Sequence, residues 1–350
     1  MKMNLKKYGN LVLLISLLAG TFWVIFSKLD MKNFMSTLKN SDPRYLLAGL
    51  LCMLVYWGIE AGILDILLKK VYPKTKYWTA FKITLVGQYY SFLTPFASGG
   101  QPAQLYEMKK DEIPLTGGTA VLVSKFILFQ VTVTIYALVL TLYKLPVLMN
   151  DLKAASTFVF VGLLINTIGL GMIVMIAFNS SKMKTIISNF ILWLSKIHVV
   201  KNPEKHIQKL VEFIDEYDVC LKTYKDDWLL TLGLFAASVI QVTAFFSITF
   251  FVYKALGLSG ASIYHIVTLQ ALLYMAIAFI PSPGTVGAAE AGFALLLGSV
   301  FSANLIAVAL LLWRGISYYF GLVVCGLFTL YLYTFDRNRK LAGQTMKVSA

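Results

Sequence analysis

The sequence predicts an all-α polytopic membrane protein, folded as a single integral membrane domain over residues 1–350. Of the 350 residues, 58% are hydrophobic, and the mean hydropathy is +0.73. Apolar runs close to the roughly 20 residues that a helix needs to cross a bilayer recur along the chain. Such a composition is that of a membrane protein and not of a soluble core. About six full spans and two interrupted apolar hairpins account for these runs.

Composition also excludes several functions. The net charge of +14 does not indicate nucleic-acid binding, because the basic residues lie between apolar runs, where they orient the chain and meet anionic lipid headgroups. The three cysteines are scattered and the three histidines isolated, so we expect no disulfide framework and no metal site. No HExxH, GxSxG or Walker motif occurs. We therefore expect no cofactor and no enzymatic activity.

The full spans follow from apolar length and flanking signals. The basic N-terminus resembles a secretory signal, but its apolar run is long for that role and further spans follow, which indicates an uncleaved anchor. Ser41-Asp42-Pro43 is a helix-start signal ahead of the second span. In chain order, the predicted spans cover residues 10–27, 45–68, 117–143, 156–178, 228–253 and 304–333.

Two further apolar segments, residues 77–106 and 262–301, are interrupted by proline and glycine. Proline removes a backbone donor and restricts the residue before it, so a helix should end at each interruption. Broken backbone is tolerated in lipid only where it is packed in protein or lines a wet cavity. We therefore expect two re-entrant hairpins with functional tips. Their candidate site residues are Pro95, Gly99, Gly100 and Gln101 in the first, and Pro283, Gly284 and Gly287 in the second.

The distribution of basic residues favours this topology. If both hairpins return to the side they entered, about two thirds of the 31 Lys and Arg residues face the cytoplasm. The share would be smaller if every apolar segment crossed the membrane completely. The positive-inside rule therefore favours the re-entrant topology. Both termini are then cytoplasmic, in the cell membrane of a prokaryote. The order span, span, hairpin, span occurs over about 10–145 and again, inverted, over about 155–335, as in many secondary transporters.

Residues 179–227 form the only long hydrophilic stretch and are predicted to be a basic cytosolic insert. Apolar residues at spacings of three and four indicate an amphipathic helix in its first part, and a second short helix near residues 207–214. Two interpretations of the first helix fit equally well. It lies on the membrane surface, or it packs against other cytosolic parts of the protein.

Ionisable residues inside the apolar segments are the remaining candidates. A charge at that depth costs several kcal/mol unless it is paired or hydrated, and it usually faces a pathway. The polar residues concerned are Glu60, Gln88, Lys125, Glu290 and Arg314. Only four of the 31 basic residues are arginine, and a guanidinium binds carboxylate or phosphate through two parallel bonds. We predict that Arg314 pairs with Glu290 at rest and binds a lipid phosphate during turnover; a permanent buried pair with Glu290 or Glu60 is the alternative.

Two stretches resemble the lysylphosphatidylglycerol synthase transmembrane (flippase-like) family. They are the segment from Thr94-Pro95 to Pro102 and the run PSPGTVGAAEA at residues 281–291, and the resemblance covers about residues 10–335. It implies a domain that moves modified or glycosylated lipids between leaflets. Because the chain ends at Ala350, we expect a stand-alone member without the aminoacyltransferase domain. Gln101 and Ser124-Lys125 stand where relatives often carry charged residues, so the headgroup is not determined.

The expected function is therefore that of a lipid translocase. It would move an anionic or modified phospholipid, a glycolipid or a prenyl-phosphate lipid between leaflets, with the two tips meeting near mid-membrane. One alternative is a non-transporting partner of a separate lipid synthase or glycosyltransferase. Another is a membrane-embedded lipid-modifying transferase with Glu290 or Glu60 as general base. Membrane lipids are the expected partners; transport direction, energy coupling and oligomeric state do not follow from the sequence.

Overall fold

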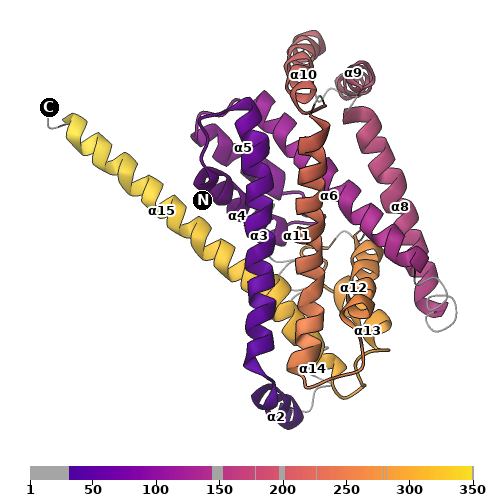
Figure 1. The fold of residues 1–350 in the computed structure, drawn as a ribbon. Helices are drawn as coiled ribbons and strands as arrows, with labels where there is room; N and C mark the ends of the chain where they lie inside the picture. Colours follow the sequence, from indigo (N-terminus) through magenta and orange to yellow (C-terminus); the bar gives the residue numbers. More distant parts are fainter. Residues whose placement is uncertain are drawn as a thin grey trace.

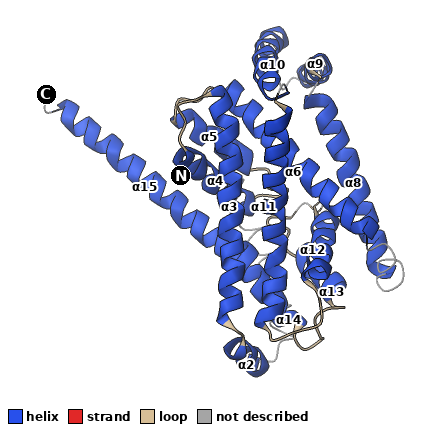
Figure 2. Ribbon diagram, viewed as in Figure 1, coloured by secondary structure: helices blue, strands red, loops and turns tan. Residues whose placement is uncertain are grey.

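The computed structural model describes residues 31–143, 153–177, 179–196, 202–225, 227–278, 280 and 282–348. Over these residues the chain is built from helices and contains no β-strand, which confirms the predicted all-α class (Figures 1 and 2). The predicted span at residues 10–27 lies outside them. The other five predicted spans are therefore the ones compared with the structure.

Four of the predicted spans are helical segments long and apolar enough to cross a membrane. They are α3 (Pro43–Val71), α6 (Leu115–Tyr143), α11 (Trp228–Ala255) and the segment Ile306–Thr334. The last consists of α14 (Ile306–Arg314), the π-helix η1 (Gly315–Phe320) and the start of α15 (Gly321–Val348). The fifth is α8 (Lys153–Ala177), whose apolar part, Val159–Met172, is shorter.

The helix-start signal before α3 works as predicted. Asp42 Oδ1 accepts the backbone N–H of Arg44 at 2.9 Å, and Pro43 occupies the first helical position, where its missing N–H is not needed. Asp227 caps α11 in the same way, through the N–H of Leu230 at 3.0 Å. The two capped helices share the most extensive helix–helix contact of the described chain.

Each predicted hairpin is a pair of short helices joined by an irregular turn. The first pair is α4 (Tyr77–Leu93) with α5 (Gly100–Lys110), and the second is α12 (Ile263–Ile277) with α13 (Ala288–Leu297). In the view of Figure 1 the first pair lies in the upper half of the bundle and the second in the lower half. The two hairpins therefore extend toward each other from opposite ends of the bundle.

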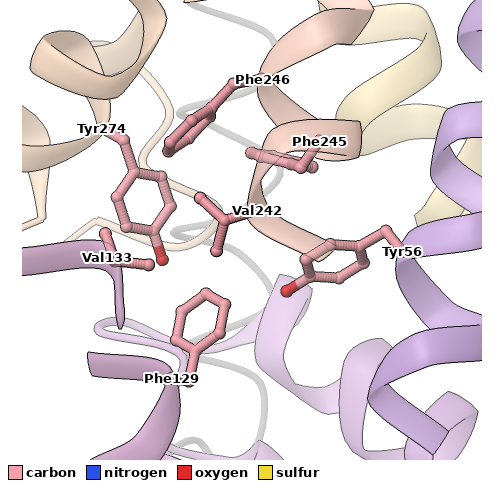
Figure 3. A pocket seen from close by; sticks show the side chains of 7 residues that line it. All are labelled: Tyr56, Phe129, Val133, Val242, Phe245, Phe246 and Tyr274. Carbon is pink, nitrogen blue, oxygen red and sulfur yellow. The ribbon is translucent and has the colours of Figure 1, made fainter. Parts of the chain in front are cut away.

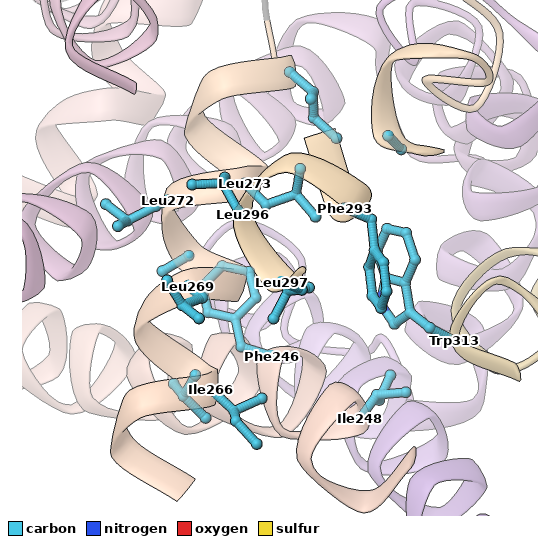
Figure 4. Close-up of a cluster of buried hydrophobic side chains, with 14 of the residues drawn as sticks. Phe246, Ile248, Ile266, Leu269, Leu272, Leu273, Phe293, Leu296, Leu297 and Trp313 are labelled. Atoms are coloured by element: carbon cyan, nitrogen blue, oxygen red, sulfur yellow. The ribbon is translucent and has the colours of Figure 1, made fainter. Parts of the chain in front are cut away.

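Two apolar clusters hold the hairpins in place, and Leu85 of the first hairpin also belongs to the cluster around the second. The second hairpin packs between α11 and α14, where the rings of Phe293 and Trp313 stack with centroids 5.0 Å apart (Figure 4). The first hairpin packs against α3 and α6 through a cluster that includes Ile83, Met108 and Val121. Because both clusters are buried, the position of each turn is fixed by the helices around it.

The insert forms α9 (Ser180–Lys196) and α10 (Pro203–Lys225), which lie at one end of the bundle (Figure 1). The predicted amphipathic helix is thus present, and α10 is longer than the short helix expected near residues 207–214. α9 contacts α10 and leaves the side chains of Ile186, Phe190 and Trp193 exposed. The contact with α10 is compatible with packing against other parts of the protein. The exposed apolar side chains are compatible with a position on the membrane surface. α2 (Met31–Asn40) lies at the other end of the bundle.

Candidate functional site

The tips of the two hairpins meet. We call residues 94–100 tip 1 and residues 282–288 tip 2. Pro95 of tip 1 and Pro283 of tip 2 form an antiparallel β-bridge, so the interruptions face each other as the sequence predicts. The two tips are in direct contact in this structure.

Both tips have the same backbone path over their first five residues. After each proline, two successive residues adopt left-handed angles, with φ of 54° at Phe96, 54° at Ala97, 58° at Gly284 and 54° at Thr285. Such angles cost about 1–3 kcal/mol for a residue other than glycine, so surrounding contacts must hold them. The same two backbone hydrogen bonds close each turn, Ala97 to Thr94 and Ser98 to Pro95 in tip 1, and Thr285 to Ser282 and Val286 to Pro283 in tip 2. One local structure is therefore used twice.

The tips differ at the glycine that begins the second helix of each hairpin. In tip 1, Gly99 has φ −79° and its N–H donates to the hydroxyl of Thr94 at 2.8 Å. In tip 2, Gly287 has φ +87° and its N–H donates to Glu290 Oε2 at 2.5 Å. Ser282 is the counterpart of Thr94, but its hydroxyl oxygen is buried without a hydrogen-bond partner among the described residues. A carboxylate has thus replaced a hydroxyl as the cap in tip 2.

Arg314 holds the same carboxylate. Its Nε lies 2.6 Å from Glu290 Oε1, and its Nη1 donates to the carbonyl oxygen of Gly284 at 3.2 Å. Nη2 is buried and has no hydrogen-bond partner in the described part of the chain, although Arg314 is only 5% exposed. The predicted Arg314–Glu290 pair is therefore formed, and the alternative pair with Glu60 is not. An unpaired, buried guanidinium donor is costly, and it needs an explanation.

Tyr318 connects both tips, and sequence reasoning missed it. Its hydroxyl donates to the carbonyl oxygen of Phe92, at the end of α4, at 3.2 Å. Its ring covers Gly284, where a Cβ would come within 2.2 Å of the ring. Tyr318 belongs to η1, which begins directly after Arg314. The spacing of four residues from Arg314 was the available signal, because it places both side chains on one side of a helix.

A second ion pair lies in the first half of the chain. Lys125 Nζ is 2.8 Å from Glu60 Oε1, and Gln88 Nε2 donates to Glu60 Oε2 at 2.6 Å. Both oxygens of this carboxylate therefore have a donor. The three residues come from α6, α3 and α4, so the pair ties the first hairpin to its two neighbouring helices.

A small cavity lies between α3, α6, α11 and α12. Its volume is about 40 Å³, and its wall carries the hydroxyls of Tyr56 and Tyr274 among apolar side chains (Figure 3). A space of that size holds about two or three water molecules and excludes a lipid headgroup.

Residues 11–325 match the family model for the lysylphosphatidylglycerol synthase TM region. The match covers most of the chain. The chain belongs to the lysylphosphatidylglycerol synthase TM region family. No curated protein matches it. Membership in this family places the chain among multi-pass membrane proteins related to lipid metabolism or translocation.

In this lysylphosphatidylglycerol synthase TM region protein, the predicted site residues form two groups. The tip junction gathers Pro95, Gly99, Gly100, Pro283, Gly284, Gly287, Glu290 and Arg314. The second ion pair gathers Glu60, Gln88 and Lys125. Gln101 is exposed on the first turn of α5 and takes part in neither ion pair. Lys125 therefore has its own carboxylate and does not share Glu290 with Arg314.

Proposed function

We propose that this protein is a lipid translocase in the cell membrane, and that the lipid headgroup passes the junction of two re-entrant hairpins. The termini, α9 and α10 are cytoplasmic in this proposal. The first hairpin enters from the cytoplasmic side and the second from the opposite side. A non-helical backbone at this depth is compatible with lipid because the tips are packed against each other and against Tyr318.

The observation that carries the proposal is the free donor of Arg314 at the tip junction. A guanidinium offers its Nε and Nη2 side as a fork that fits two oxygens of a phosphate. Glu290 occupies only Nε of that fork, and Nη2 is buried without a partner among the described residues. A lipid phosphate supplies the missing acceptor. The acyl or prenyl chains stay in the bilayer, so only the headgroup needs a polar route.

The same contacts indicate what has to move. Nη2 is inaccessible while Pro95 and Pro283 are in contact and Tyr318 bonds to Phe92. A lipid phosphate can therefore reach Nη2 only when the tips separate. Because the tips enter from opposite sides, movement of one tip would open the site toward one leaflet and movement of the other toward the opposite leaflet. Repeats of opposite orientation around a central site are the usual basis of such alternating access.

The test is transport in liposomes that contain a fluorescent anionic phospholipid or its zwitterionic counterpart. We expect the wild type to move the anionic lipid and Arg314→Ala to lose this activity. Arg44→Ala is the matched control, because Arg44 is exposed at the start of α3 and only its backbone N–H makes the capping bond. Equal transport by wild type and Arg314→Ala would contradict the proposal.

The two alternative functions give different outcomes in the same experiment. A lipid-modifying transferase would yield a chemically altered lipid, detectable by mass spectrometry after incubation with the purified protein. A partner of a separate synthase would show no transport alone, and its function in cells would depend on the surface of α9 and α10.

A further inference from the structure

Comparison with tip 1 indicates a second candidate acceptor for the N–H of Gly287. In tip 1 the equivalent N–H, on Gly99, bonds to the hydroxyl of Thr94. In tip 2 the counterpart hydroxyl, on Ser282, is buried and makes no hydrogen bond within the described residues. Glycine crosses between negative and positive φ at little cost. Gly287 can therefore adopt the φ of Gly99 and transfer its N–H from Glu290 to Ser282.

Arg314 can also exchange its partner. Glu290 contributes one oxygen to the guanidinium and uses the other on Gly287. A phosphate group brings two or three oxygens to the same fork, and bidentate charge-assisted pairs are the stronger ones. An anionic headgroup that takes Nε and Nη2 thus displaces Glu290, which no longer needs to cap Gly287.

The displaced carboxylate then lies without a cation. Glu290 is 8% exposed, and the ionisable groups that face it are Arg314 from α14 and Tyr318 and Tyr319 from η1. α12 presents apolar side chains to α13, and the end of α4 presents the ring of Phe92 to Tyr318. A buried carboxylate that has lost its counter-charge is stable only when it is protonated.

We propose that Glu290 couples a proton to the headgroup: one proton enters with each anionic lipid that binds Arg314. This inference rests on the proposed function. A hydronium ion on the open side gives a proton to the Glu290 carboxylate and leaves as water, and the lipid phosphate replaces that carboxylate on Arg314. On release the carboxyl group returns its proton to water and pairs with Arg314 again. The charge of the site is the same in both states, and a proton gradient can drive lipid movement because the coupling is reciprocal.

The second ion pair lacks the features that make this exchange feasible. Both oxygens of Glu60 are bonded, to Lys125 and Gln88, and no helix cap depends on this carboxylate. Lysine can also lose its own proton, whereas arginine stays charged. Proton coupling is therefore assigned to Glu290 and not to Glu60.

The test is calorimetric binding of dihexanoyl phosphatidylglycerol to the full-length protein in nanodiscs of zwitterionic lipid. Measurements in buffers of different ionisation enthalpy give the number of protons taken up. For the wild type we expect about one proton per lipid, and an affinity that rises by as much as about tenfold for each unit that the pH falls. Glu290→Gln should bind with no proton uptake and no pH dependence.

Two results would overturn the inference while leaving the proposed function intact. They are wild-type binding without proton uptake, and full uptake by Glu290→Gln. Absence of binding by the wild type would instead contradict the proposed function, and the inference with it. Arg314→Ala, which should lose binding at every pH, separates the specific site from lipid that partitions into the nanodisc.

Ser282→Ala gives a second test that does not disturb the resting contacts. The hydroxyl oxygen of Ser282 has no hydrogen bond to any residue that the structure describes, so a purely structural role predicts no change in affinity. If Ser282 receives the N–H of Gly287 when the lipid binds, the affinity should fall roughly three- to tenfold. Ser282→Thr should retain wild-type affinity, because tip 1 uses a threonine in this place. Unchanged affinity in Ser282→Ala would contradict the exchange of caps.

Discussion

Tip 1 and tip 2 share a backbone path but end in different polar groups. In tip 1 the cap is the hydroxyl of Thr94, and Pro102 stands where tip 2 carries Glu290. In tip 2 the cap is a carboxylate that Arg314 also binds, and the hydroxyl of Ser282, the counterpart of Thr94, is buried without a partner in the described chain. The first tip has one way to satisfy its glycine N–H and the second has two. The two tips thus share a backbone conformation but differ in their polar groups. We expect tip 1 to keep its capping hydrogen bond and tip 2 to exchange its own.

The two ion pairs differ in the same way. Lys125, Glu60 and Gln88 satisfy each other, while Nη2 of Arg314 has no partner among the residues that the structure describes. A buried ion pair whose hydrogen-bonding groups all have partners connects helices. Under the proposed function, a pair with an unpaired donor can also bind an anion. The comparison predicts that substitutions around Arg314 mainly reduce transport. Substitutions around Lys125 should mainly reduce stability.

The largest effect should come from joining the tips covalently. Because neither proline has an N–H, Pro95 and Pro283 form a non-hydrogen-bonded pair, in which side chains come closest. In a cysteine-free background, Pro95→Cys with Pro283→Cys should form a disulfide that stops transport in liposomes, and reduction should restore it. Each single cysteine variant is a control. Full transport in the oxidised double variant would show that the tips need not separate.

Exchanging the cations should sharpen the contrast between the ion pairs. Arg314→Lys keeps the charge but loses the fork, so the protein should fold while transport of the anionic lipid falls about ten- to hundredfold. Lys125→Arg keeps a cation beside Glu60 and should retain transport within about twofold. Thermal unfolding in detergent checks folding, and the liposome assay checks transport. Normal transport by Arg314→Lys together with loss of transport by Lys125→Arg would contradict this assignment.

Glycine substitutions test the tips themselves. Gly284→Ala places a Cβ at a φ of +58° and 2.2 Å from the ring of Tyr318, so it should lower the free energy of unfolding by about 2–5 kcal/mol. Gly287→Ala meets no atom within 4 Å and should cost only about 1–2 kcal/mol, from its φ of +87°. Chemical denaturation in detergent measures both values. A larger loss for Gly287→Ala would mean that contacts with Tyr318 matter less than backbone strain.

The smallest effect concerns the helix caps outside the membrane. Hydrogen bonds from Lys70 and from the N–H of Leu230 lower the pKa of Asp227 below its ordinary value. A lowered pKa adds stability above the unfolded value, and this stability is lost as the pH falls through the folded value. Acidification should therefore loosen the start of α11, as hydrogen exchange of its first turn would report. Asp227→Asn should remove that pH dependence; if it persists, another group causes it.

Sequence reasoning succeeded where local physics decides the outcome. Apolar length located α3, α6 and α11, and Asp42-Pro43 located a helix start. Proline and glycine located both tips. The likeness of the tips was not visible, because Phe96-Ala97 and Gly284-Thr285 adopt the same angles with unrelated side chains. That conformation is imposed by packing, which no residue pattern records.

Pairing of charges was predictable only in part. The rarity of arginine singled out Arg314, and Glu290 in the second hairpin proved to be its partner, as predicted. The separate pair of Glu60 with Lys125 depends on how α3 and α6 lie together, and Gln88 joins it from a third helix. Tyr318 acts on two segments distant in sequence, so its role appears only once they are brought into contact.

The π-helix η1 gives the last span an unusual property. It occupies six residues, from Gly315 to Phe320, immediately after the arginine. A π turn holds more residues for its length than an α turn, so extra chain is stored at the middle of this span. Conversion of η1 to α-helix would lengthen this part of the span and move Arg314 along the helix axis relative to the start of α15. Such a displacement needs no hinge, and it would carry a bound anion with it.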